Sequence, residues 1–195
     1  MAEKSKKLVC IGTSTGGPRA LQHLLPLFPN DFQVPILIVQ HMPPVFTKSL
    51  ANRLNTLAHI RVKEAEDGET IEGGTAYIAP GGSHMTVKRK PQALTIHLDQ
   101  SEPDKGHRPS VNRLFQSLTE AVDYEKIVVV LTGMGSDGTD GLRRLKSVDR
   151  DRVTAIAEAE ESCIVFGMPK SAIKANVIDH IVPLERMADV ILHYV

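Results

Sequence analysis

The chain of 195 residues has only two cysteines, no tryptophan and no surplus of charge of either sign. Lysine plus arginine equals aspartate plus glutamate, at 23 each, so the formal net charge is zero. Because affinity for a nucleic-acid backbone comes from clustered cations, this balance gives no support for nucleic-acid binding. No apolar run approaches the roughly 20 residues that a membrane-spanning helix needs. We therefore expect neither a nucleic-acid partner nor direct insertion into a membrane.

The two cysteines, Cys10 and Cys163, lie far apart in the sequence and form no Cys-x-x-Cys pattern. Metal sites and disulfide frameworks normally need more cysteines or a closer spacing. We expect no metal site and no disulfide, and we expect both thiols to act as small buried hydrophobic groups.

The segment 1–7 is charged and polar, and the apolar run at 8–11 is too short for a secretory signal. These features predict a cytoplasmic protein.

Short, fully apolar runs alternate with helical patterns along the chain, which predicts an α/β fold. The runs at 8–11, 36–39, 127–131 and 153–157 are typical of buried strands, and 181–182 is a short final strand. Fully apolar strands that are each followed by a helix indicate a parallel sheet covered on both faces. The expected helices are Pro18–Leu27, Phe46–Leu57, Ser110–Ala121, Gly141–Ser147, Met168–Lys174 and Leu184–Tyr194.

The middle of the chain has a different pattern. Segments at 75–78 and 85–98 are shorter, alternate between apolar and polar residues, and are separated by turn residues. We predict peripheral strands and hairpins there. The whole fold is then a doubly wound, mostly parallel sheet with helices on both faces and a small antiparallel hairpin region.

Residues suited to catalysis follow three of the expected strands. The first strand runs into Gly12–Pro18, the second into Gln40–Pro44 and the third into Thr132–Gly138. In a parallel sheet the carboxyl ends of the strands share one edge, and active sites lie just beyond it. The three loops are therefore expected to meet.

The first loop places Ser14 among glycines before a helix. Backbone N–H groups at such a position stabilise a developing oxyanion, which favours a nucleophilic serine. A loop of this kind also binds phosphate, so a nucleotide- or phosphate-binding module is an alternative. The loop lacks the Gly-Lys-Ser/Thr signature and the Gly-x-Gly-x-x-Gly signature, which weakens that alternative.

The other two loops supply a base and an acid. A serine hydroxyl needs a base to accept its proton, and His41 follows the strand expected beside that of Ser14. Asp137 can orient this histidine and stabilise its charged form, with Asp140 as the rival acid.

Gly12-x-Ser14-x-Gly16 also matches the nucleophile elbow of α/β-hydrolases. In that alternative a late histidine, His180 or His193, would be the base, while His84 lies in a glycine-rich loop.

The sequence resembles the catalytic domain of the chemotaxis protein-glutamate methylesterases, the CheB family. The matching stretches occur in the family's order and span nearly the whole chain: Ile11–Gly17, Gln40–Pro43, Tyr77–His84, His107–Val111, Leu131–Gly138 and Val165–Pro169. The resemblance implies a doubly wound α/β domain that hydrolyses glutamate γ-methyl esters of chemoreceptors and deamidates receptor glutamines.

The resemblance also implies roles for individual residues. Ser14 matches the nucleophile, His41 the histidine and Asp137 the aspartate of the family's triad, while the backbone N–H of Met134 matches its oxyanion donor. Thr15, beside Ser14, belongs with Met134 among the residues expected to contact the oxyanion or the substrate. We expect no cofactor, a monomer, and methyl-accepting receptor cytoplasmic domains as partners. A related esterase that acts on another protein remains an alternative.

Two departures from the family pattern are visible. Typical members carry an N-terminal phosphorylatable receiver domain, whereas this chain starts just before the first expected strand. We therefore expect a single catalytic domain over 1–195 with the receiver domain absent. The segment 157–162 differs from the family's usual run, and Asn112 stands where an acid is usual. Both positions lie outside the expected triad.

Overall fold

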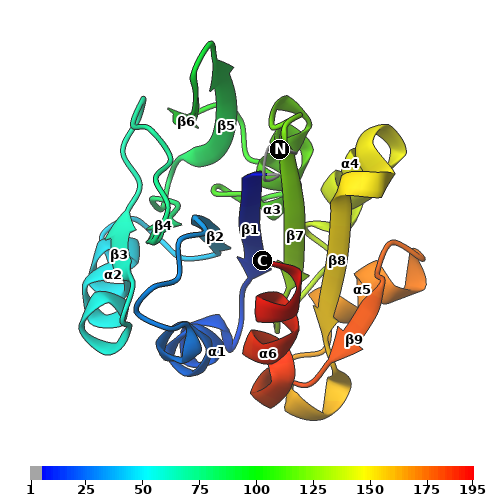
Figure 1. Cartoon of the computed structure of the whole chain (residues 1–195). Coiled ribbons are helices and arrows are strands. Elements are labelled where there is room, and N and C mark those ends of the chain that lie inside the picture. Colours follow the sequence, from blue (N-terminus) through cyan, green and yellow to red (C-terminus); the bar gives the residue numbers. More distant parts are fainter. Residues whose placement is uncertain (1–5) are drawn as a thin grey trace.

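A parallel sheet of seven strands runs through the centre of the computed structural model, which describes residues 6–195 (Figure 1). The strand order is β3-β4-β2-β1-β7-β8-β9, and every neighbouring pair in it is parallel. A separate antiparallel pair, β5 with β6, forms the hairpin. The predicted α/β fold is confirmed. The strands are β1 (Lys6–Thr13), β2 (Ile36–Gln40), β3 (Arg61–Glu64), β4 (Thr75–Ile78), β5 (His84–Lys90), β6 (Ala93–Asp99), β7 (Tyr124–Val130), β8 (Val153–Glu158) and β9 (His180–Val182).

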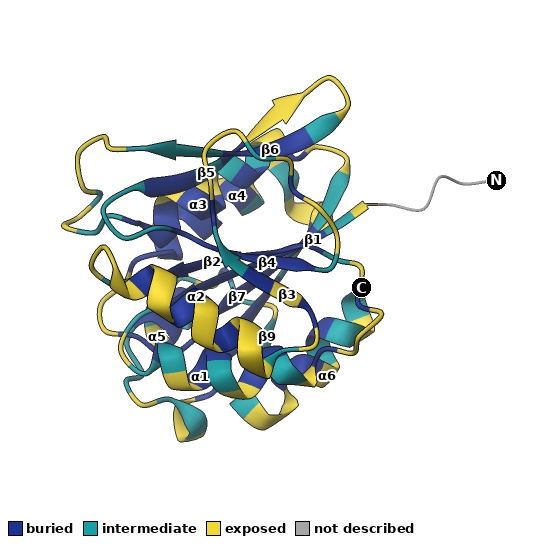
Figure 2. Cartoon of the chain, turned by 90° about the vertical axis from the view of Figure 1, so that its left-hand side faces the viewer, coloured by how far each residue is buried: buried dark blue, intermediate teal, exposed yellow. Residues whose placement is uncertain are grey.

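Helices cover both faces of the sheet because successive strand residues point to opposite sides. Along β1, Leu8 and Cys10 enter one core, while Val9 and Ile11 enter the other. The first core is closed by α3, α4, α5 and the hairpin, and the second by α1, α2 and α6 (Figure 2). The helices are α1 (Gly17–Leu24), α2 (Phe46–Leu57), α3 (Val111–Ser117), α4 (Thr139–Asp149), α5 (Met168–Lys174) and α6 (Leu184–Tyr194).

Most predicted elements occur where the sequence indicated them, with three kinds of difference. The segment 75–78, expected among the peripheral strands and hairpins, is β4, which lies inside the parallel sheet between β3 and β2. The helices expected at 18–27 and 110–121 both end in a 3₁₀ turn, at Leu25–Leu27 and at Leu118–Glu120. The strand β3 was not predicted. It lies at the edge of the sheet, pairs only with β4 and buries only Val62, so its sequence has no apolar run.

The two cysteines differ in their surroundings. Cys10 is fully buried in β1, as predicted, and burial raises the pKa of its thiol. Cys163 is only partly buried, which corrects the expectation that both thiols lie in the core. Burial, together with the charge of nearby Glu158, raises the pKa of the Cys163 thiol to about 12. Both sulfurs are therefore protonated and weakly nucleophilic at neutral pH.

The sheet reverses its order at β1, which lies between β2 and β7. From β1 the chain moves to β2 on one side and later enters β7 on the other side. Thr13 is in register with Gln40, and Gly12 is in register with Val130. The three strands thus end at nearly the same level, which is the position where open α/β sheets bind their ligands. No helix among residues 6–195 is both long and apolar enough to cross a membrane.

Candidate active site

Ser14 directly follows β1 and is fixed through its backbone. Its N–H donates to the carbonyl oxygen of Thr132 at 3.0 Å, and its own carbonyl accepts from the N–H of Gly17 at 2.8 Å. A Cβ atom at residue 133 would lie 2.9 Å from the Ser14 Cβ, so only glycine allows the two loops to approach this closely. The loops after β1 and β7 are therefore in direct contact at Ser14.

Thr132 ties the Ser14 loop to the loop after β8. Its hydroxyl donates to the carbonyl oxygen of Thr15 at 2.9 Å and accepts from the N–H groups of Ile164 (3.1 Å) and Val165 (3.0 Å). The Thr132 N–H donates to Glu158 Oε2 at 2.7 Å. Glu158 is fully buried, and this burial raises the pKa of its carboxyl. The buried carboxyl of Glu158 thus holds Thr132, which in turn bonds the loop that carries Ser14.

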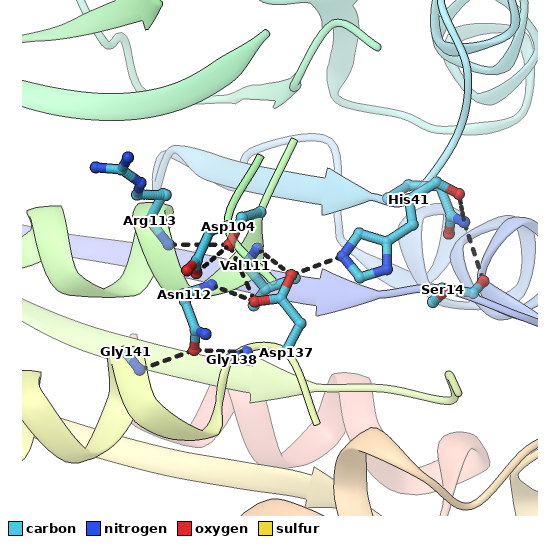
Figure 3. Close-up of polar contacts among 11 residues, drawn as sticks. Ser14, His41, Asp104, Val111, Asn112, Arg113, Asp137, Gly138 and Gly141 are labelled. Carbon is cyan, nitrogen blue, oxygen red and sulfur yellow. Dashed lines mark hydrogen bonds and ion pairs between the residues drawn. The ribbon is translucent and has the colours of Figure 1, made fainter. Parts of the chain in front are cut away.

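His41 follows β2, and its ring lies between Asp137 and Ser14 (Figure 3). The Nε2 atom is 2.7 Å from Asp137 Oδ2. The Nδ1 atom is buried and has no hydrogen-bond partner among the described residues. One ring nitrogen is therefore paired with the acid, and the other is left for the serine. A long or missing serine–histidine hydrogen bond is common before substrate binds.

Asp137 is 4% exposed and lies among hydrogen-bond donors. Besides His41, its oxygens accept from the N–H of Val111 at 2.7 Å and the N–H of Asn112 at 2.8 Å. Burial opposes ionisation, but the hydrogen bonds from His41, Asn112 and Val111 outweigh it and lower the pKa of Asp137. The carboxylate is charged at neutral pH and can hold a histidine proton on Nε2.

Two residues at the start of α3 secure Asp137 further. The Ser110 hydroxyl lies 3.0 Å from Asp137 Oδ1 and 3.1 Å from Asp104 Oδ2, and it caps the helix as expected. The side-chain oxygen of Asn112 accepts from the N–H groups of Gly138 and Gly141, each at 2.9 Å. Asn112 thus fixes the turn that carries Asp137, a role that its position in the sequence did not indicate.

Gln40 links the nucleophile loop to the histidine. Its Nε2 atom donates to the carbonyl oxygens of Ser14 (2.9 Å) and His41 (3.0 Å). A Cβ at residue 17 would lie 1.9 Å from Gln40 Oε1, so the glycine there makes room for the amide. Gln40 is 2% exposed. It lies within one of the matching stretches, but nothing in the sequence pattern gave it this bridging role.

Met134 follows a glycine whose backbone N–H and carbonyl are both hydrogen-bonded. The N–H of the preceding Gly133 donates to Val165 at 3.0 Å, and the Gly133 carbonyl accepts from Met168 at 2.8 Å. The Met134 side chain is 65% exposed, and the chain turns at Gly135, whose φ is +87°. The Met134 N–H is thus carried by a rigid turn one residue from the contact between Gly133 and Ser14.

The rival residues are placed elsewhere. Asp140 is exposed and pairs with Lys105 and Arg143 rather than with His41. His180 lies on the edge strand β9, which β7 and β8 separate from β1, and its Nε2 lies 2.6 Å from the hydroxyl of Tyr194. Two further histidines are also engaged away from Ser14: His193 packs against Tyr194, and buried His84 bonds the Glu102 carbonyl.

A cleft of about 280 Å³ opens beside His41. One side is formed by His41, Met42 and Pro43, and the other by residues 106–109. The cleft gives a side chain of a substrate a place next to the histidine. Among residues 6–195, no group of three or more His, Cys, Asp or Glu side chains is arranged to hold a metal ion. The three loops bring together a serine, a histidine and a carboxylate.

The chain is similar to known proteins over nearly its whole length. The family model for CheB methylesterase matches residues 9–191. A protein-glutamate methylesterase/protein-glutamine glutaminase of Halalkalibacterium halodurans is 56% identical over 187 residues, which cover 96% of this chain and 53% of that protein. The protein of the same name from Bacillus subtilis is 51% identical over 183 residues. The chain spans about half the length of these relatives.

A solved structure gives the same result. The crystal structure of the CheB methylesterase catalytic domain of Thermotoga maritima superposes with a TM-score of 0.92 at 43% sequence identity. The match covers 98% of this chain and 100% of that one. With a family model that covers most of the chain and relatives above 50% identity, the conclusion is direct: the chain belongs to the CheB methylesterase family.

Proposed function

We propose that this chain is a serine hydrolase that removes methyl groups from glutamate γ-methyl esters of chemoreceptors, and that it works in chemotaxis adaptation. The observation that carries the proposal is the His41 ring between Asp137 and Ser14, with Nε2 bonded to the carboxylate and Nδ1 unpaired. This is the relation that a nucleophile, its base and an orienting acid require. The names of the relatives support the choice of ester.

The reaction begins when Ser14 Oγ attacks the ester carbonyl and His41 Nδ1 takes the hydroxyl proton. Asp137 keeps the other proton on Nε2 and stabilises the imidazolium that forms. The backbone N–H of Met134 donates to the oxyanion, and Thr15, the residue after Ser14, is the second residue proposed to contact the oxyanion or the substrate. Such a donor contributes about 2.7–4 kcal/mol to transition-state stabilisation.

The intermediate then collapses as His41 returns its proton to the leaving oxygen, which releases methanol. His41 then takes a proton from water, which attacks the Ser14 ester, and returns that proton to Ser14 Oγ as the bond breaks and the glutamate is released. The same steps convert a glutamine to glutamate with ammonia as the leaving group, since only the leaving atom differs. We therefore propose deamidation of receptor glutamines as a second activity of the same site.

A phosphate-binding role for the loop is a weaker proposal because two of its backbone N–H groups already have acceptors within the protein. The Ser14 N–H bonds to Thr132 and the Gly17 N–H bonds to Ser14. A phosphate cradle needs such N–H groups free to face the ligand. The geometry therefore favours hydrolysis over nucleotide binding.

The proposed partners are the cytoplasmic domains of methyl-accepting receptors, and the proposed location is the cytoplasm. In keeping with the family pattern, a phosphorylatable receiver domain would control access to Ser14. The alternative is an esterase of the same mechanism that acts on another protein, and substrate choice depends on the surface around the cleft.

The direct test is to incubate the protein with a methylated receptor cytoplasmic domain and measure methanol release. Mass spectrometry of the receptor follows deamidation in the same sample, because each glutamine converted to glutamate adds about one dalton. Methanol release supports the proposal. Tight nucleotide binding by calorimetry, without release of methanol or ammonia, would overturn it in favour of the binding module.

A further inference from the structure

A second histidine lies flat against His41. The rings of His41 and His107 are stacked, with centroids 4.0 Å apart and planes only 4° from parallel. His107 comes from the loop before α3, so it reaches His41 from a different part of the chain than Ser14 or Asp137. It also lines the cleft beside His41. His107 therefore covers one face of the proposed base.

The loop that carries His107 is held in place by several contacts. Asp104 and His107 exchange two backbone hydrogen bonds, each of 3.0 Å. The Arg108 guanidinium donates to the carbonyl oxygens of Gln100 (2.9 Å) and Ser101 (3.1 Å). The Asp104 carboxylate also meets Ser110, whose hydroxyl reaches Asp137. The loop is thus connected through Ser110 to Asp137, and these contacts fix the position of His107.

Stacking supplies a restraint that the hydrogen bond does not. Among the described residues, His41 has one hydrogen bond through its ring, from Nε2 to Asp137, which leaves some freedom for the ring to turn about its Cβ–Cγ bond. Such a rotation would move Nδ1 away from Ser14. A flat ring at 4.0 Å opposes it, because the two faces must stay parallel to keep their contact.

The surroundings of His107 favour the neutral form of its ring. Burial lowers the pKa of His107, and the neighbouring His41 lowers it further, while Asp137 and Asp104 act in the opposite direction. The ring is therefore neutral near pH 7. A neutral aromatic ring attracts a cation placed over its face, and His41 becomes such a cation during the reaction.

We propose, on the basis of the function proposed above, that His107 is a positioning residue for His41. Its ring holds the His41 ring in the plane that serves both Asp137 and Ser14, and it faces the imidazolium when that forms. His107 does not exchange a proton with the substrate. What the site needs from it is a flat aromatic surface.

The test compares three substitutions of His107 in the whole chain. His107→Phe keeps a flat ring, His107→Leu keeps bulk without a ring, and His107→Ala removes both. His23→Ala is the matched control, because His23 is an exposed histidine on α1. Circular dichroism and thermal unfolding establish that each variant folds. The readouts are kcat and KM for methanol release, and the proton NMR signal of the His41 Nε2–H bonded to Asp137.

We expect His107→Ala and His107→Leu to lower kcat by about tenfold or more with a smaller change in KM, because misplacing a catalytic group by a small distance is costly. The His41 Nε2–H signal should broaden in both. His107→Phe should restore kcat and the sharp signal, and His23→Ala should change neither.

Unchanged kcat and an equally sharp signal in His107→Leu would overturn the inference, as would equal losses in the Phe and Leu variants. The NMR readout needs no substrate. If the wild-type protein releases no methanol, the proposed function fails while the signal still decides whether His107 holds His41.

Discussion

His41 bonds Asp137 through Nε2, at 2.7 Å, and keeps Nδ1 on the side of Ser14. In the chymotrypsin arrangement the roles of the two nitrogens are the reverse, with Nδ1 bonded to the acid and Nε2 facing the serine. The chemistry is the same, since either nitrogen can accept a proton once the other is held by a carboxylate. In the sheet, the serine's strand β1 lies between β2, which precedes His41, and β7, which precedes Asp137.

This relation predicts the tautomer of the resting enzyme. His41 should carry its proton on Nε2, where Asp137 accepts it, and leave Nδ1 unprotonated as the base. Nitrogen NMR of the labelled protein, with the His41 ring in its neutral form, distinguishes the two tautomers by their ring shifts. A proton on Nδ1 in the resting protein would contradict the assignment of that atom as the base.

Asp137→Asn should leave the loop folded and remove the charge that stabilises the imidazolium. An asparagine also favours the wrong tautomer of His41, and the corresponding change in a serine protease lowers kcat by roughly 10⁴. We expect a loss of methanol release on the order of 10³–10⁴ with KM changed far less. Asp140→Asn is the matched control, because Asp140 bonds Lys105 and Arg143 at the surface and should tolerate the change.

The stability of the fold should depend on pH through Asp137. The pKa of this carboxyl is lowered in the folded chain, so the unfolded chain binds its proton more readily. Its contribution is therefore present above the unfolded pKa of about 3.9 and is lost as the pH falls through the lower folded value. Urea unfolding from pH 6 to pH 3 should show a steeper loss of stability in the wild type than in Asp137→Asn. Parallel curves would contradict the prediction.

Asn112 should matter for stability through its oxygen. Asn112→Ala leaves the N–H groups of Gly138 and Gly141 buried without an acceptor, at a cost of about 1–3 kcal/mol in the free energy of unfolding. Asn112→Asp keeps an oxygen at this position and should lose much less. Chemical denaturation of the two variants measures this difference in the free energy of unfolding. An equal loss in both would show that the side-chain oxygen of residue 112 does not stabilise the fold.

Gln40 should affect catalysis because it joins the backbone of Ser14 to that of His41. Gln40→Ala removes both hydrogen bonds, and we expect kcat to fall by about tenfold or more as the two groups lose their alignment. Gln116→Ala, an exposed position on α3, is the control. If steady-state kinetics of methanol release show the same kcat for both variants, Gln40 does not align the site.

The buried strands and the meeting of the three catalytic loops could be predicted from the sequence, because they follow from burial and from the parallel sheet. The runs at 8–11, 36–39 and 127–131 are apolar throughout because helices cover both faces of their strands. Their shared edge explains why Ser14, His41 and Asp137 could be expected to meet. The edge strand β3 was not predicted because only Val62 is buried in it, so its sequence has no apolar run.

The supporting residues could not be predicted in the same way. Asn112 and His107 lie in or beside a loop whose path no periodic pattern specifies, and their roles depend on which backbone groups that path brings near. Thr132 and Glu158 are polar residues at strand ends whose partners lie on other loops. Such contacts follow from the folded geometry. His107 and Thr132 lie in matching stretches, whereas Asn112 and Glu158 do not, and the partners of none of the four could be predicted from the sequence.

The central claim is that Ser14 is the nucleophile of a glutamate methylesterase. The most direct measurement is the rate of methanol release from a methylated receptor cytoplasmic domain, for the wild-type chain and for Ser14→Ala. Thermal unfolding of both proteins serves as the check on folding. The account predicts release by the wild type and a fall to background in Ser14→Ala at an unchanged melting temperature. Full release by the folded Ser14→Ala variant would contradict it.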